Sequence, residues 1–379
     1  MKIIVAALLA MQFAQRPPNA PAETLLQPEL LRTIERASVE GKPVRVIAGS
    51  DKTAGEIVLA CAAQCEPVEW AMQKLFTSGV PQPARTIRVI TVQQPPADAK
   101  AAIFVAESSG ATFQVIRGLW STAGIADEIV EIFARHAVSA VNIRSYERVG
   151  QPRWEGRGIP ITTIVPPADA TGLDRVSFTA AASAYFLATL PNPGAEALLS
   201  HLTVGAHARL AEDGRRAIAL MGNQQRASAE VLVLLGQAIE REQRRMRSLE
   251  RFMPAPVDPM LRARIADMEQ GITSVWTSLG ITGSPFVPPA QRLRGRSGED
   301  RRVPARITGP LPAPTDLPAA LAKHPNAAEV TYELLNFIDG RRSISDIRDA
   351  VAAEFGSVPL PAVVEYFERL AQAGAVVLK

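Results

Sequence analysis

Metal-binding and nucleophilic side chains are scarce in this chain and widely spread. Its 379 residues include four histidines and two cysteines: His136, His201, His207, His324, Cys61 and Cys65. Imidazole, thiolate and carboxylate groups are the ligands that zinc selects, and a thiolate beside a histidine can act as a nucleophile. The spacing of these residues fits no zinc or thiol-hydrolase motif. The nucleophile elbow Gly-x-Ser-x-Gly, the phosphate loop and His-Glu-x-x-His are also absent from the sequence.

The closest pairs among these residues have poor geometry for joint chemistry. His201 and His207 lie six positions apart in a predicted helix and therefore point to different faces, so a core or surface role is favoured over a zinc pair. Cys61 and Cys65 flank a predicted strand end, which disfavours a disulfide unless the chain turns sharply there. No spacing brings either cysteine to His136 as a thiol dyad. The oxidation state of the cysteines stays open.

Strands and helices alternate through the first half of the chain. Apolar runs predict strands at 44–48, 56–62, 86–92, 101–106, 113–116, 140–143 and 159–165, and helices at 24–40, 69–78, 123–137 and 177–190. This alternation predicts an α/β fold with a sheet covered by helices on both faces. In such sheets a site is expected at the carboxyl ends of the strands.

Four segments resemble, in order, the dizinc aminopeptidase family, which includes glutamate carboxypeptidase-like and transferrin-receptor protease-like domains. They are Glu56–Pro67, Pro83–Ile90, Phe104–Gly110 and Gly158–Asp169, and the likeness extends over roughly residues 55–190. The resemblance implies an aminopeptidase-like mixed sheet flanked by helices. It also implies a pair of zinc ions held by histidines and carboxylates at the strand ends, where they activate water.

The positions that the resemblance assigns to zinc ligands carry other residues. Ala63 stands where a histidine is expected, and the turn with the bridging aspartate is missing. Gln93 and Gln94 replace a general base and a ligand, and an amide cannot accept the proton of zinc-bound water. Val165 stands at the last histidine position. Glu107 alone keeps a carboxylate, which is a weak candidate metal ligand or simply a polar residue at a strand end.

The middle of the chain reads as helices only. Candidate helices at 198–210, 227–252 and 260–279 are interrupted at Gly214 and at several prolines. Residues Glu240–Arg251 are dense in arginine and glutamate, which predicts a solvated helix face with i,i+4 pairs. An alternative is that the basic residues Arg241–Arg251 contact an envelope surface.

The C-terminal part predicts a small separate unit after a Pro- and Arg-rich linker. Three helices, at 327–338, 344–355 and 359–372, precede a strand at 375–378, with Ser343 as an N-cap. The segment Glu333–Ser343 resembles winged-helix domains of the pyrroloquinoline-quinone synthesis protein D type. That resemblance implies peptide or protein binding, or docking on a neighbouring domain. No nucleic acid is expected, because the helix 359–372 has only Arg369 as a basic residue.

The N-terminus has the layout of a secretory signal. Met1-Lys2 precedes the apolar run Ile3–Ala10 and then small and polar residues; a buried first strand is the alternative. The net charge of +3 is too mild to indicate an anionic partner. We expect no transmembrane helix. The expected organisation is a leader at 1–22, an aminopeptidase-like domain at 23–192, a helical extension at 193–283, a linker at 284–325 and a winged-helix domain at 326–379.

The sequence favours an exported, non-catalytic peptidase-fold protein that acts as a scaffold or a peptide-binding module. We expect no catalytic residue and no cofactor. The alternative is a zinc-dependent aminopeptidase with a reduced or displaced metal site, which would need histidines and carboxylates to converge at the carboxyl ends of the strands.

Overall fold

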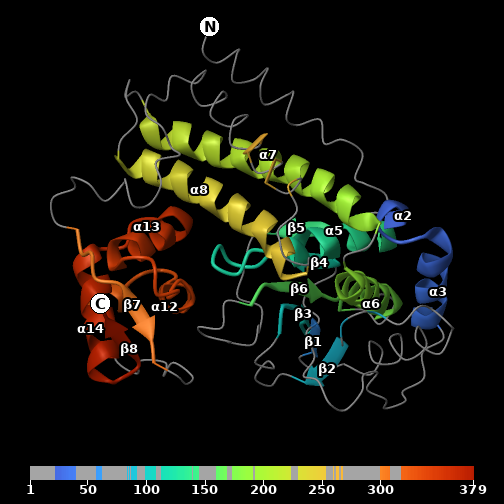
Figure 1. Ribbon diagram of the computed structural model, residues 1–379, viewed down its shortest axis with the longest axis horizontal. Coiled ribbons are helices and arrows are strands. Elements are labelled where there is room, and N and C mark those ends of the chain that lie inside the picture. The colour runs from blue at the N-terminus through green and yellow to red at the C-terminus, as the bar shows by residue number, and fades with distance from the viewer. Residues whose placement is uncertain are drawn as a thin grey trace, which may run out of the picture.

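A mixed sheet, a pair of long helices and a C-terminal helical unit make up the described parts of the chain (Figure 1). The computed structural model describes residues 22–39, 57–61, 83, 85, 87–91, 99–107, 112–138, 140–144, 159–168, 173–190, 193–222, 229–252, 259, 262–263, 266–267, 299–307 and 317–379. Residues 1–21 of the predicted leader, the strand at 44–48, the helix at 69–78 and nearly all of the helix at 260–279 lie outside these residues.

The α/β class expected from the sequence is confirmed by the central sheet. Among the described residues, its strands are β1 (Ile57–Cys61), β2 (Ile87–Thr91), β3 (Ala101–Val105), β4 (Gln114–Ile116), β5 (Asn142–Arg144) and β6 (Ile161–Val165). Their order is β2-β1-β3-β6-β4-β5. The first four strands in this order run parallel, whereas β4 is antiparallel to β6 and parallel to β5. The carboxyl ends of β1, β2, β3 and β6 therefore share one edge, opposite the end of β4.

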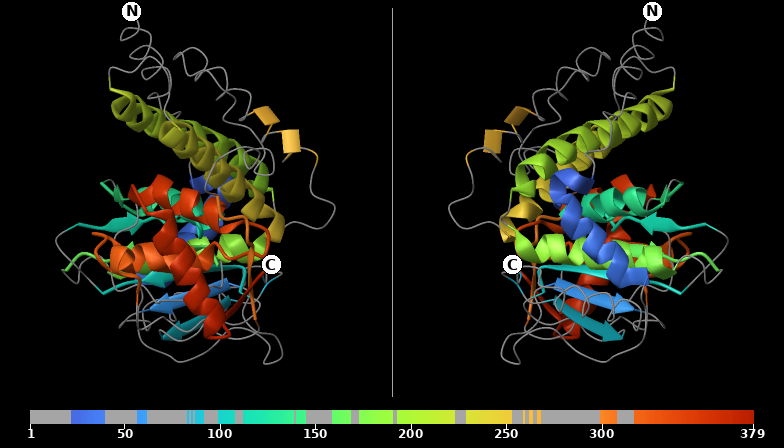
Figure 2. Two further views of the ribbon diagram at one scale, coloured as in Figure 1. Left: turned by 90° about the vertical axis from the view of Figure 1, so that its left-hand side faces the viewer. Right: turned by 90° about the vertical axis from the view of Figure 1, so that its right-hand side faces the viewer.

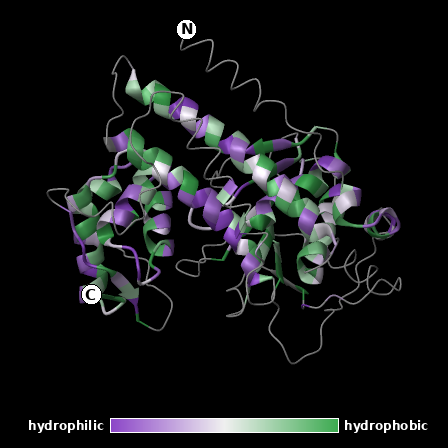
Figure 3. Cartoon of the chain, turned by 45° about the horizontal axis from the view of Figure 1, so that its top comes forward, coloured by the Kyte–Doolittle hydropathy of each residue, from purple (hydrophilic) through white to green (hydrophobic). Residues whose placement is uncertain are grey.

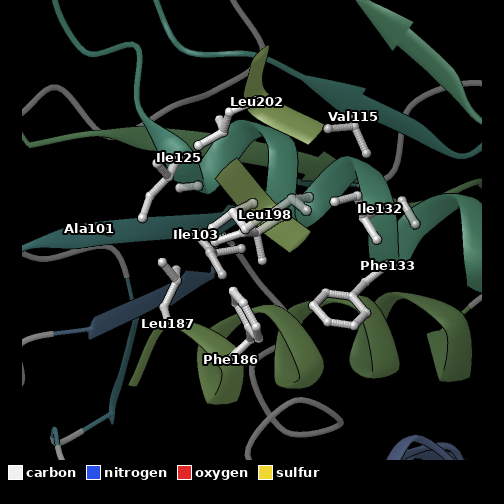
Figure 4. Close-up of a cluster of buried hydrophobic side chains, with 14 of the residues drawn as sticks. Ala101, Ile103, Val115, Ile125, Ile132, Phe133, Phe186, Leu187, Leu198 and Leu202 are labelled. Atoms are coloured by element: carbon white, nitrogen blue, oxygen red, sulfur yellow. The ribbon is translucent and has the colours of Figure 1, made fainter. Parts of the chain in front are cut away.

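The described helices of this domain lie on one face of the sheet. They are α2 (Ala22–Leu25), α3 (Pro28–Val39), α5 (Ile125–Ala137) and α6 (Leu173–Thr189); the single helix expected at 24–40 is split into α2 and α3. Alternate sheet residues, such as Ile103, pack with Phe133 and Phe186 in a large buried cluster (Figure 4). Phe133 meets Phe186 edge-on, with ring centroids 6.3 Å apart. The opposite face forms a second cluster around Phe104.

Two long helices, α7 (Gly194–Met221) and α8 (Ala229–Arg247), run side by side above both other parts (Figure 2). A 3-10 turn, Ser248–Arg251, extends α8. The break expected at Gly214 is wrong, because α7 continues through this buried residue. A glycine inside a helix costs about 1 kcal/mol, which is less than the helix gains by packing its apolar residues along α8.

The start of α7 requires a residue without a side chain. A Cβ on Gly194 would lie 2.5 Å from the Leu25 carbonyl oxygen and 2.8 Å from Cε2 of Phe186. Both neighbours are buried, so the helix would have to shift. We expect Gly194→Ala to lower the free energy of unfolding by about 1–3 kcal/mol, measured by urea denaturation. An unchanged midpoint would show that α2 and α7 can move apart enough to accommodate the added methyl group without loss of stability.

The C-terminal unit has its own core and its own small sheet. It comprises β7 (Pro304–Arg306), α11 (Ala319–Ala322), α12 (Ala327–Asn336), α13 (Ile344–Phe355), α14 (Leu360–Gln372) and β8 (Val376–Leu378). Ser343 caps α13 in a capping box with Asp346, which confirms the predicted N-cap. β7 pairs antiparallel with β8. Residues 304–306, expected in a linker, therefore belong to this unit, because β8 needs a partner for its backbone groups.

Two remaining observations concern the cysteines and the membrane. Cys61, at the end of β1, is disulfide-bonded, and the only other cysteine in the sequence is Cys65. The spacing of the two cysteines disfavoured a disulfide unless the chain turns sharply, so the bond at Cys61 differs from that expectation. None of the helices that the structure describes is both long enough and apolar enough to span a bilayer.

Candidate functional site

The carboxyl edge of the sheet holds the two described positions that the family resemblance singles out. Glu107 is exposed two residues beyond β3, and Val165 is the fully buried last residue of the adjacent β6. Ala63, Gln93 and Gln94 lie outside the described residues. Within the described part of the chain, no three histidine, cysteine, aspartate or glutamate residues are grouped so that they could hold a metal ion.

Charged side chains gather instead at the opposite edge of the sheet. The loop after β4 leads into α5 there, and Asp127 in the first turn of α5 organises it. Thr162 Oγ1 donates to Asp127 Oδ1 at 2.6 Å, and the Gly118 amide donates to the same oxygen at 3.1 Å. Arg245 Nη1 of α8 donates to Asp127 Oδ2 at 2.7 Å. Asp127 thus ties the sheet, the loop and α8 together in a buried position.

Glu242 is the centre of a buried charge network between α7 and α8. Arg209 contacts its carboxylate through Nε and Nη2, at 3.0 and 2.8 Å. Arg241 Nε donates to it at 2.7 Å, and Arg245 Nε lies 3.6 Å away. Burial disfavours the charged carboxylate, but Arg209, Arg241 and Arg245 outweigh that effect and lower the pKa of Glu242 to about 2. Glu242 is therefore ionised at neutral and mildly acidic pH.

The network extends to α5 through Glu128. Arg209 Nη1 donates to Glu128, and His201 Nε2 lies 3.3 Å from its second oxygen. Although burial opposes its charge, Arg209 and His201 hold the pKa of Glu128 well below its usual range. His201 thus belongs to the network. Both histidines lie in α7, where a spacing of six residues places them on different faces, and burial lowers the pKa of His207.

The solvated helix face predicted for Glu240–Arg251 is wrong for Arg241, Glu242 and Arg245, which are all buried. Arg247 and Arg251 of the same segment are exposed, so an envelope contact through them stays a prediction. Figure 3 shows hydrophilic turns of α8 in the interior, between the C-terminal unit and the sheet domain. A sequence signal existed: Arg241 and Arg245 continue, at helical spacing, the buried apolar stripe of α8. Charged residues that continue an apolar stripe are expected to be buried beside residues of opposite charge and not to face solvent.

The C-terminal unit docks on this edge through two carboxyl groups. Glu354 of α13 accepts from the Trp120 amide, which lies 3.2 Å from both carboxyl oxygens. Glu333 of α12 accepts from the Ser121 amide at 2.9 Å and from the Ser121 hydroxyl. Arg244 of α8 donates to the Trp120 carbonyl at 2.9 Å. The intramolecular docking that the sequence left open is therefore present.

Burial dominates the electrostatics of this carboxyl pair. It raises the pKa of Glu333 to about 7, against the smaller opposing effect of the bonds from Ser121. Burial also raises the pKa of Glu354 well above its usual range, and the neighbouring charge of Glu333 raises it further. At neutral pH the pair can therefore hold a proton that exposed carboxyl groups would have lost.

Aromatic rings complete the contact. Trp120 packs against the core of the sheet domain and against the core of the C-terminal unit. The Arg241 guanidinium lies 4.6 Å from the Trp120 ring centroid, and the Arg244 guanidinium lies 5.0 Å from that of Phe337. Such cation–π contacts contribute about 0.5–2 kcal/mol each. No residue pattern in the sequence singled out Trp120, Glu333 or Glu354 as contact residues.

Comparisons with known proteins give no relative. No family model matches the chain, and no curated protein or solved structure matches it significantly.

Proposed function

We propose that this chain is an exported, non-catalytic protein of aminopeptidase-like fold whose winged-helix-like C-terminal unit binds an extended peptide along strand β8. The proposal rests on the position of β8, which lies at the edge of the small sheet. Within the described residues, the β7–β8 sheet has two strands, so β8 has a partner on one side only. An extended peptide can add to such an edge as a third strand.

The hydrogen-bond pattern identifies the groups on that edge. The amide and carbonyl of Val303 both bond to Lys379, so this pair is of the hydrogen-bonded type. Because the two types alternate along an antiparallel pair, the amides and carbonyls of Val376 and Leu378 point away from β7. Val377 is 46% exposed on the same strand. The edge thus offers backbone groups for pairing beside an accessible apolar side chain.

The edge of β7 is less suited to a peptide. Pro304 lacks an amide hydrogen, which removes a donor from this strand. Arg306 Nη2 also crosses from β7 to the Leu335 carbonyl at 2.9 Å. Edge strands that carry proline are protected against pairing, so β8 is the favoured side.

The non-catalytic part of the proposal rests on the residues at the carboxyl edge of the sheet. Val165 cannot bind zinc, and Glu107 by itself supplies one carboxylate where a dizinc centre needs several ligands. Export rests on the signal-like start of the sequence, and the disulfide at Cys61 fits an oxidising compartment.

Zinc content separates this proposal from the aminopeptidase alternative. We expect elemental analysis of the purified, dialysed protein to find far less than one zinc ion per chain, and aminoacyl substrates to remain uncleaved. Stoichiometric zinc together with hydrolysis would overturn the non-catalytic assignment.

Peptide binding is tested with linear peptides selected from a phage-displayed random library. We expect Leu378→Pro, which removes an outward amide, to weaken the selected peptides by about tenfold or more, since a lost hydrogen bond in a binding edge costs about 1–3 kcal/mol. Leu378→Ala is the matched control, because it removes the same side chain and keeps the amide. Equal binding by the two variants, or a library without binders, would contradict pairing at β8.

A further inference from the structure

We propose that the contact between the carboxyl pair Glu333–Glu354 and the loop residues Trp120–Ser121 is a proton-dependent latch, which holds the C-terminal unit on the sheet domain at acidic pH and weakens as the pH rises. This regulation goes beyond the proposed peptide binding. It also uses a different face of the unit, since α12 and α13 face the rest of the molecule while β7 and β8 form the small sheet (Figure 1).

The geometry brings two carboxyl groups to one place. Glu333 and Glu354 come from neighbouring helices and accept from the amides of consecutive residues, Ser121 and Trp120. The two carboxyl groups lie close enough for each to shift the pKa of the other. Two charged carboxylates repel each other at close range, so a proton on one of them favours the docked contact.

The positive charges that face the pair are already engaged. Arg244 donates to the Trp120 carbonyl, and Arg241 is bound to Asp213 at 2.9 Å and to Glu242. On the remaining sides, Arg216 of α7 donates to the Ala353 carbonyl at 2.9 Å, and Arg342 pairs with Asp339 and with Glu240. These arginines soften the repulsion that follows loss of the proton. They do not form an ion pair with either carboxyl group in the structure.

The sign of the pH dependence follows from proton linkage. Burial raises the pKa of both carboxyl groups in the docked state, that of Glu333 to about 7. Exposed by undocking, glutamates return to a pKa of about 4.3. Between these values the docked state binds up to two protons more than the undocked state. The docking equilibrium therefore falls about tenfold per pH unit for each of these protons as the pH rises through this window, and the latch is strongest below it.

Hydrogen exchange of the Trp120 and Ser121 amides measures the latch in the full chain, because both amides donate to the carboxyl pair. After correction for the intrinsic rate, we expect their protection in the wild type to fall by more than tenfold per pH unit between about pH 5 and pH 7. Glu354→Gln should keep an acceptor for the Trp120 amide and removes one of the two titrating groups. Because Glu333 stays buried, we expect protection in this variant to fall less steeply than in the wild type, by about tenfold per pH unit at most.

Two further variants make the outcome decisive. Glu333→Gln removes the other titrating group and should make the profile shallower in the same way, which covers the case that Glu354→Gln fails to fold. Glu365→Gln makes the same chemical change on the exposed face of α14 and should keep the wild-type slope. A flat wild-type profile, glutamine variants that retain the slope, or a control that loses it would each overturn the latch.

Discussion

Glu242→Ala is expected to lower the free energy of unfolding by about 3–5 kcal/mol, the cost of leaving buried charge without its partner. Glu242 is fully buried and holds Arg209, Arg241 and Arg245 around one carboxylate. Arginine cannot escape this situation by losing its proton, because it stays charged in proteins. The loss should appear in urea denaturation as a lower midpoint.

An exposed carboxylate on the neighbouring helix provides the matched control. Glu212 of α7 pairs with Arg215 at the surface, and such a pair contributes at most about 1 kcal/mol. We expect Glu212→Ala to shift the midpoint far less than Glu242→Ala does. Equal losses in the two variants would mean that the buried network has no special weight in stability.

The same carboxylate also predicts how the protein responds to acid. The pKa of Glu242 is about 2 in the folded protein and about 4.3 in an unfolded chain. Its contribution is therefore complete above the unfolded value and is lost as the pH falls toward about 2. The wild type should lose stability over this interval, and Glu242→Ala should show a shallower loss there.

Trp120→Ala is expected to weaken the docking of the C-terminal unit by about 3 kcal/mol, since removal of a large aromatic side chain from a packed site costs this order of free energy. Trp120 belongs to both cores and lies under the Arg241 guanidinium. Without the indole, the two parts share less apolar contact. Urea denaturation that is a single transition in the wild type should separate into two, one for each core.

Trp120→Phe is the control for this prediction. It keeps an aromatic ring between the two cores and leaves the backbone amide that Glu354 accepts from unchanged. We expect it to retain most of the coupling. If Trp120→Ala unfolds as cooperatively as the wild type, the docking depends on the polar contacts of Glu333 and Glu354 rather than on the ring.

The buried charges and the docking contact lie at a different edge of the sheet from the one at which the family resemblance predicts a site. The carboxyl edge of the sheet holds Glu107 and Val165, while the charge network and the docked unit lie at the opposite edge, beyond Asp127. The C-terminal unit therefore docks on the edge of the sheet opposite Glu107 and Val165.

Much of the local structure could be predicted from the sequence, because local signals determine it. Apolar runs located the strands from β1 to β6, and the Ser343 cap marked the start of α13. These elements depend on period, capping and burial within a short segment. The same reasoning failed at Gly214, where the packing of α7 on α8 outweighs the poor helix propensity of one residue.

The candidate site was decided by tertiary structure alone. Arg241 and Arg245 look like surface residues in a charged segment, but α5 brings Asp127 against Arg245 and α7 brings Asp213 against Arg241. Likewise, Glu333 and Glu354 are separated from Trp120 by more than half of the chain, and only docking makes them one contact. Local sequence signals located most of the described helices and strands, but not the break between α2 and α3, the continuity of α7 or the strand β7. Which charges are buried and paired depends on distant partners, and the free energy of a charge depends on those partners rather than on its neighbours in sequence.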